Sequence, residues 1–366
     1  MPMKHSAIMD ALMKLRNSVT SSIMLFVAAL VPAGIVSSAG QPTQSKTVLA
    51  IDGTRFTLNE TPIFLVGISY YGGLGAPDDF LQCDLDDLQR YGFNWLRVWA
   101  TWSASDQDVS AVTADGHARQ PFFSRLEHLV AECNRRGLVV DVTLSRGQRS
   151  KTATEGVKLP DLDSHRRAVE TIVTALKPYR NWYLDLANER DVRDQRYVSI
   201  EELKTLRDVV RKLDPPRLVT ASFGGHDLSA EDLRGSLLTV GVDFVCPHRP
   251  RHAQSPGQTE AMTRSCLAMM KDIGRTVPVH YQEPFRRGYG SWQPTASEFL
   301  ADLRGAQAGG AAGWCFHNGR QQDTPDGRPY RSFDLHEQRL FDQLDAQERE
   351  VIARIRIMAT GDKSGR

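Results

Sequence analysis

Residues 182–189 read Trp-Tyr-Leu-Asp-Leu-Ala-Asn-Glu, a short and largely apolar run that ends in two polar residues, Asn188 and Glu189. Similar runs recur along the chain at intervals of 24 to 45 residues, beginning near Ile63, Phe93, Leu138, Arg217, Gly241, Val277 and Ala311. Parallel strands that are covered on both faces have this continuous apolar composition. The pattern therefore predicts eight buried parallel strands.

Helical periods lie between these runs. Apolar residues from Phe122 to Cys133 fall on one helical face, and Gly137 follows where a helix would end. A second stripe runs from Val169 to Leu176, and a final helix is expected from His336 to Ile357. Two capping boxes are also predicted, by Ser199 with Glu202 and by Thr295 with Glu298.

Eight strand–helix units in roughly 300 residues predict a (β/α)8 TIM barrel over residues 63–358, as a single domain. The alternative is a doubly wound open sheet, which usually carries a GxGxxG loop after its first strand. The segment Gly67 to Gly73 contains no such motif. A short β-hairpin is expected within residues 40–62, because Asp52-Gly53 suits a tight turn between two apolar segments.

The N-terminus has the order of a secretory signal peptide. Basic residues Lys4, Lys14 and Arg16 precede an apolar run from Ile23 to Val36, and small residues follow at 37–39. Residues 1–39 are therefore predicted to be a cleaved signal, and the protein is expected to be secreted or periplasmic. An uncleaved membrane anchor is the alternative. Residues 359–366 are predicted to be a disordered tail.

The composition excludes several classes of function. The chain has 366 residues, 41% of them hydrophobic and 24% charged, with a formal net charge of +1. Such a balance is typical of a globular protein and provides no overall field for nucleic acid. The 5 cysteines include no CxxC pair, and no HExxH, EF-hand, Walker or GxSxG motif occurs. Neither a metal nor a cofactor is therefore expected, and the protein is expected to be a monomer.

Two glutamates end predicted strands and carry the functional prediction. Glu189 closes the fourth strand and Glu283 the seventh. Barrel enzymes place their chemistry at the C-terminal ends of strands, and glycoside cleavage needs two carboxylates there. One carboxyl must be protonated to supply a proton to the leaving oxygen, and the other must be ionised to attack or stabilise the anomeric carbon. The alternative is that each glutamate is a surface carboxylate at the start of the next helix.

The strand ending in Ala-Asn-Glu189 resembles the acid/base strand of clan A retaining glycoside hydrolases, above all glycoside hydrolase family 5. The hairpin with the following strand, the segment around Arg97, and the segment ending in His248 resemble the family in order and spacing. The resemblance covers roughly residues 47 to 320. It implies that Glu189 is the general acid/base and Glu283 the nucleophile of a retaining hydrolysis of a β-linked glycan, without a cofactor.

The resemblance also implies a set of residues that bind the carbohydrate. Asn188 would bind the sugar 2-hydroxyl, and Arg97 would keep Glu283 ionised. The remaining expected substrate-binding residues are His248, Trp314, Tyr70 and Tyr281, with Trp314 in the position of a stacking tryptophan.

The sequence departs from the family at several positions. Pro250 stands where a tyrosine usually contacts the nucleophile, and Tyr281 or Arg249 is considered as its replacement. The third predicted strand ends in Leu144-Ser145-Arg146 instead of a histidine. These departures keep open an inactive, non-catalytic carbohydrate-binding barrel.

A group of arginines follows two of the predicted strand ends, at Arg249, Arg251, Arg286 and Arg287. They would suit an acidic sugar, although a solvated charged rim is the favoured interpretation.

Overall fold

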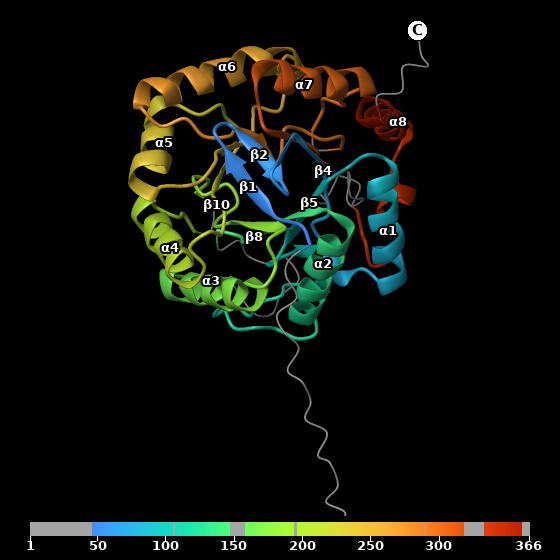
Figure 1. Cartoon of the computed structure of the whole chain (residues 1–366). Coiled ribbons are helices and arrows are strands. Elements are labelled where there is room, and N and C mark those ends of the chain that lie inside the picture. The colour runs from blue at the N-terminus through green and yellow to red at the C-terminus, as the bar shows by residue number, and fades with distance from the viewer. Residues whose placement is uncertain are drawn as a thin grey trace, which may run out of the picture. The chain divides into compact units, whose positions relative to one another are not determined.

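The described residues form a ring of parallel strands surrounded by helices (Figure 1). The structure is a computed structural model, and it describes residues 46–104, 107–146, 158–193, 196–288, 290–317 and 333–360. The predicted signal at 1–39 and residues 361–366 of the predicted tail lie outside the described residues. Within the described residues no helix is long and apolar enough to cross a membrane.

Seven strands form one parallel sheet in the order β10-β9-β8-β5-β4-β14-β13. Their bounds are Val219–Thr220, Trp182–Asp185, Val139–Thr143, Trp95–Trp99, Leu65–Ser69, Gly313–Phe316 and His280–Tyr281. The gap between β10 and β13 is filled by β11 (Ser222–Phe223), which pairs with β12 (Cys246–Pro247). A parallel bridge between Val245 and Val279 then joins this pair to β13. The predicted (β/α)8 barrel is confirmed.

The helices follow the strands as the sequence predicts. Those of the described residues are α1 Asp78–Arg90, α2 Phe122–Arg136, α3 Leu162–Leu176, α4 Ile200–Leu213, α5 Ala230–Arg234, α6 Ser255–Ile273, α7 Ala296–Gly309 and α8 Ala346–Thr360. Gly137 ends α2 with a left-handed φ of 74°, and Ser199 and Glu202 form the predicted capping box of α4.

The last helix differs from its prediction. It begins at Ala346 instead of near His336, and a short 3-10 segment, η3 (Leu340–Gln343), precedes it. Asp345 and Glu348 each accept a hydrogen bond from the other's backbone N–H, which fixes the start of α8. The apolar spacing before this point reflects packing of the 3-10 segment, since Leu340 and Phe341 are buried.

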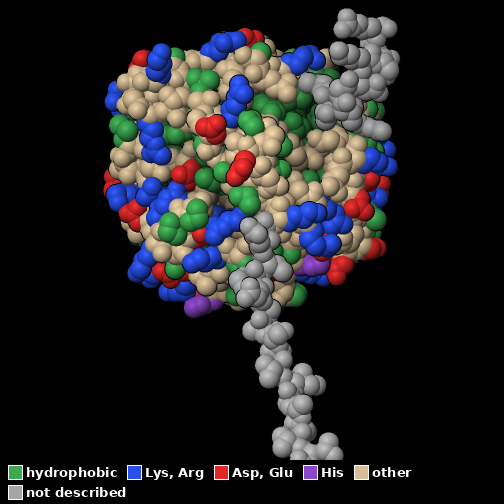
Figure 2. Space-filling view, in the orientation of Figure 1, with side chains coloured by type: hydrophobic (Ala, Val, Ile, Leu, Met, Phe, Trp, Pro, Cys, Tyr) green, Lys and Arg blue, Asp and Glu red, His purple; other side chains and the backbone are tan. Residues whose placement is uncertain are grey.

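A three-stranded antiparallel sheet covers the N-terminal end of the barrel. Its strands are β1 (Leu49–Asp52), β2 (Arg55–Leu58) and β3 (Thr61–Ile63), and Figure 1 shows β1 and β2 in front of the ring. Phe56 packs with a layer of barrel side chains that includes Trp95, Tyr183 and Phe244. Figure 2 shows this end of the molecule, where basic, acidic and hydrophobic side chains are intermixed. Because Phe56 and the barrel side chains pack together, they fill the interior at this end of the barrel.

Alternation along the strands decides which residues enter the barrel. In β5, Trp95 joins the inner layer and Arg97 lies above it, whereas Leu96 and Val98 pack in the outer core. The same alternation holds in β14, where Cys315 belongs to the inner layer and Trp314 to the outer core. Residues of one parity therefore line the interior, and residues of the other parity face the helices.

The 5 cysteines are all unpaired, and only Cys83 is exposed. The remaining thiols are buried, and burial raises the pKa of each of them, to about 12 for Cys266. None therefore has the ionised, accessible thiolate that a reactive cysteine needs.

Candidate active site

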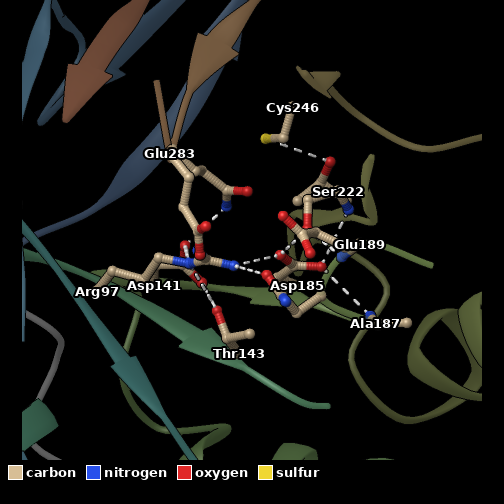
Figure 3. Close-up of polar contacts among 12 residues, drawn as sticks. Arg97, Asp141, Thr143, Asp185, Ala187, Glu189, Ser222, Cys246 and Glu283 are labelled. Carbon is tan, nitrogen blue, oxygen red and sulfur yellow. Dashed lines mark hydrogen bonds and ion pairs between the residues drawn. The ribbon is translucent and has the colours of Figure 1, made fainter. Parts of the chain in front are cut away.

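Glu283 lies at the barrel mouth in the centre of a set of hydrogen-bond donors. Arg97 Nη1 donates to its Oε1, and the Tyr71 hydroxyl donates to the same oxygen at 2.5 Å. Arg97 reaches Glu283 from the second barrel strand, as Figure 3 shows. The predicted contact between these two residues is thus present in the structure.

Glu189 follows β9 and stands in an unusual backbone conformation. Its φ is 46°, which is a left-handed value that residues with a Cβ adopt at a cost. Its backbone N–H donates to the Ser222 hydroxyl at 3.0 Å, and Ser222 in turn donates to Asp185 at 2.9 Å. These contacts turn the Glu189 side chain back over the mouth, where its Oε1 lies 3.2 Å from Nδ1 of His248.

The two glutamates face each other across a short gap. One oxygen of each, together with a ring nitrogen of His248, lie within 4.8 Å of one another. Arg251 spans this gap, because its Nη2 donates to Glu189 Oε1 at 3.3 Å and to Glu283 Oε2 at 2.9 Å. Three such atoms have the spacing of metal ligands, but the positive charge of Arg251 beside both carboxylates opposes the binding of a metal cation there.

Both carboxylates are held in the ionised form. Burial raises the pKa of Glu283, but its interactions with His248, His317 and the two guanidinium groups of Arg97 and Arg251 outweigh burial and hold that pKa well below its ordinary value. Burial likewise raises the pKa of Glu189, and the hydrogen bond from His248 with the charge of Arg251 leaves it lowered. In this arrangement Glu283 is suited to nucleophilic attack, and Glu189 is not yet a proton donor.

Arg97 supports the site from below by contacting several acids. Its Nη2 donates to Asp185 and to Asn188, both at 3.0 Å, and its Nε lies 3.0 Å from Asp141. With Glu283, one buried guanidinium therefore faces three carboxylates (Figure 3). Burial raises the pKa of Asp141 despite the nearby arginine, so Asp141 is the acid that most readily holds a proton.

Tyr71 and His317 join the site, although neither is among the substrate-binding residues expected from the resemblance. His317 Nδ1 lies 2.9 Å from the Ser69 hydroxyl and 3.2 Å from that of Tyr71, and its Nε2 lies 3.8 Å from Glu283. Tyr71 supplies the hydroxyl that the sequence lacks at Pro250. The parity of β4 and β14 is the signal that could have found them, since Ser69 and Tyr71, like Cys315 and His317, differ by two positions.

Arg97, Asn188 and His248 are brought together with the two glutamates, but three other predicted residues are not. Tyr70 donates to Asp84 at 3.2 Å, and the Tyr281 hydroxyl lies 2.6 Å from that of Thr263 on α6. Neither reaches the mouth.

Trp314 also lies outside the mouth. Its side chain is fully buried, and its indole N–H donates to Asp302 on α7 at 2.6 Å. Strand parity turns it toward the helices, so in this structure it offers no face for a sugar to stack on.

Aromatic side chains beside Tyr71 line one side of the site. Its ring lies 5.5 Å from that of Trp99 and 5.1 Å from that of Trp102. Trp102 is 8% exposed and Trp99 is 4% exposed. Trp99 is the last residue of β5, and Trp102 lies in the loop that follows it.

Comparison with known proteins places the fold. No family model and no curated protein matches the sequence. The chain is similar in structure to a glycoside hydrolase family 5 mannosidase from Rhizomucor miehei, with 13% identity over 87% of this chain and 99% of that one and a TM-score of 0.58. It is also similar to an endo-1,4-β-D-mannanase from Thermotoga petrophila, with 15% identity over 81% and 99% of the two chains and a TM-score of 0.57.

A third neighbour is a Bacteroides vulgatus protein assigned to the glycoside hydrolases, with 15% identity and a TM-score of 0.63. The match covers 88% of this chain and spans about 62% of the length of that protein. At such identities the similarity concerns the arrangement of the elements. The chain thus has the (β/α)8 barrel fold that these glycoside hydrolases share.

Proposed function

We propose that this protein is a glycoside hydrolase that cleaves a β-linked glycan by a retaining double displacement. The observation that carries the proposal is the pair Glu189 and Glu283, whose closest oxygens lie within 4.8 Å at the barrel mouth. Retaining enzymes hold their two carboxyl groups about 5–5.5 Å apart, whereas inverting enzymes leave room for a water between them. The similarity in fold to family 5 mannanases agrees with this assignment.

In the proposed reaction Glu283 attacks the anomeric carbon. Arg97 and Tyr71 keep its carboxylate ionised and aimed, and they stabilise it again when the glycosyl bond breaks. Glu189 protonates the leaving oxygen in the first step and removes a proton from water in the second. Asn188, held by Arg97, lies beside Glu189, where its amide N–H can meet the sugar 2-hydroxyl.

Removal of the proposed acid/base tests the assignment. Glu189→Ala should lower kcat on a natural glycan by about 100- to 10,000-fold, the contribution typical of general acid–base catalysis. With a 2,4-dinitrophenyl β-glycoside the first step needs no acid, so added azide should restore turnover and yield a β-glycosyl azide. A matched control is Glu337→Ala, because this carboxylate lies at the surface beside His336, and it should leave kcat unchanged.

The competing candidate is a barrel that binds carbohydrate without cleaving it. Two features favour this candidate. Pro250 stands where the family that the sequence resembles has a tyrosine, and the guanidinium of Arg251 bridges the gap between the glutamates. A panel of mannans, β-glucans, xylans and uronic-acid polymers separates the two candidates. Binding without release of reducing sugar, together with a Glu283→Gln variant that binds equally well, would support the binding protein.

The location of the protein is a further part of the proposal. The order of charges and apolar residues in 1–39 supports export from the cytoplasm. Sequencing the N-terminus of the protein recovered from its native cells tests this directly. A mature chain that begins near residue 40 would support cleavage, and one that retains residue 1 in the cytoplasmic fraction would contradict export.

A further inference from the structure

Two arginines lie beside the glutamates at the barrel mouth, in addition to Arg97 below them. Arg251 contacts both carboxylates, and Arg146 Nη1 lies 3.9 Å from Glu189 Oε2. The mouth is therefore richer in positive charge than two catalytic carboxylates require.

These arginines are not a solvated rim. Arg251 is 15% exposed on its side chain, and Arg286 is 5% exposed. The other two arginines of the group predicted from the sequence point elsewhere. Arg249 pairs with Asp227 at 2.8 Å, and Arg287 pairs with Asp345 at 2.7 Å. Arg251 thus contacts the glutamates, whereas Arg249 and Arg287 pair with other acids.

We infer that the sugar held between Glu189 and Glu283 is a hexuronic acid, and that Arg251 binds its carboxylate. This inference rests on the proposed function, because it names the substrate class of the same site. Arginine offers a planar fork of N–H donors that matches a carboxylate in a bidentate pair.

The position of Arg251 supports the inference. A sugar can reach both glutamates only if the guanidinium leaves the gap that it now spans. A neutral sugar offers Arg251 hydroxyl groups, which replace two charge-assisted contacts poorly. A uronate brings its own carboxylate, which can accept two N–H donors of the guanidinium and so replace the two contacts with the glutamates.

The same exchange would prepare Glu189 for catalysis. Arg251 and His248 together keep Glu189 ionised in the ligand-free protein. When Arg251 moves to the substrate carboxylate, Glu189 loses a stabilising positive charge and its pKa rises. Arg146 remains beside Glu189, and Glu283 keeps Arg97 and Tyr71. An acidic substrate therefore promotes the protonated form of the acid while the nucleophile stays ionised.

The first experiment compares three activated substrates with the full chain. We expect kcat/KM for 4-nitrophenyl β-D-glucuronide to exceed that for 4-nitrophenyl β-D-glucoside and β-D-mannoside by about 10- to 100-fold, as for the gain of a charge-assisted contact. Equal or better turnover of a neutral substrate overturns the inference and leaves the proposed function standing. Absence of hydrolysis of all three substrates contradicts the proposed function instead.

The second experiment assigns the preference to Arg251. Arg251→Gln should lower kcat/KM for the glucuronide by about 10- to 100-fold more than it lowers kcat/KM for the glucoside. The matched control is Arg287→Gln, since Arg287 faces Asp345 and contacts neither glutamate. It should keep the wild-type preference. An equal loss on both substrates in Arg251→Gln overturns the role of this residue.

A binding measurement separates recognition from folding and chemistry. Calorimetry with D-glucuronate and D-glucose on Glu189→Ala, which retains Arg251, should show binding of the acid only. Arg251→Lys keeps the charge without the fork, so it should bind D-glucuronate more weakly than wild type and more strongly than Arg251→Gln. Identical affinities for D-glucuronate in the wild type, Arg251→Lys and Arg251→Gln would overturn the inference even if hydrolysis is observed.

Discussion

At the scale of single residues, the adjacent pair Tyr70 and Tyr71 shows how strand parity separates function from packing. Both tyrosines are buried and both donate to a carboxylate, but Tyr70 faces Asp84 and Tyr71 faces Glu283. Burial raises the pKa of each hydroxyl, so each remains a donor at neutral pH. Only the hydrogen bond of Tyr71 acts on the nucleophile.

Tyr71→Phe should therefore raise the pKa of Glu283, because the ionised carboxylate loses a hydrogen-bond donor. The folded pKa of Glu283 is depressed, so activity is retained above it and lost as the pH falls through it. The acid limb of the kcat/KM profile should thus move to higher pH in this variant. Tyr70→Phe is the control and should leave that limb in place. A shift in both variants, or in neither, would contradict the assigned role.

The backbone of Glu189 provides a second test at this scale. A left-handed conformation costs residues with a Cβ about 1 kcal/mol or more relative to glycine. Glu189→Gly and Glu189→Ala both remove the carboxylate, so both should lack proton donation. The glycine variant should nevertheless have a free energy of unfolding about 1 kcal/mol higher than the alanine variant, measured by urea denaturation. Equal stability would show that the φ of 46° carries no strain.

At the scale of elements, the eight strands could be predicted because each is an apolar run, but the direction of particular side chains could not. The runs around Trp182 and Leu138 became β9 and β8, and the capping box at Ser199 became the start of α4. Trp314 was expected at the mouth from the resemblance, and parity places it against α7. Arg251 lies after β12 in a loop, so no periodicity indicates where its guanidinium points.

Close approach of β4 to β5 gives a prediction for one element. A Cβ on Gly67 would lie 1.8 Å from the Trp95 ring and 2.4 Å from its backbone oxygen. Gly67→Ala should therefore lower the free energy of unfolding by about 2–4 kcal/mol, as overpacking of a core does at its upper range. Gly257→Ala in α6 is the control, because nothing lies within 4 Å of its Cβ position. It should raise stability by about 0.5–1 kcal/mol.

At the scale of the whole molecule, several buried acids give stability a defined pH dependence. Burial raises the pKa of Asp84 and of Asp302 to about 6, and it raises that of Asp141 as well. These groups bind more protons when folded, so their contribution to the free energy of unfolding falls as the pH rises from about 4 to 7. Glu283 has a depressed pKa, and its contribution is lost as the pH falls below about 4.5.

Buried His165, His280 and His317 act in the opposite direction, because burial lowers the pKa of each imidazole and the unfolded chain binds these protons below about pH 6.5. The contribution of one acid is therefore isolated by comparing the wild type with Asp302→Asn by urea denaturation between about pH 3 and 8. The variant lacks the decline that Asp302 contributes, so its free energy of unfolding should change more favourably than that of the wild type as the pH rises from about 4 to 7. Parallel pH profiles of the two proteins would contradict the assignment.

The end of the barrel below Arg97 is packed with side chains, among them Phe56, Trp95, Tyr183 and Phe244. We therefore expect water to reach Asp141 and Asp185 from the mouth of the barrel, past the two glutamates. A saccharide bound at the mouth would cover this route. Exchange of protons between solvent and the two aspartates should consequently be slower in the complex than in the free protein.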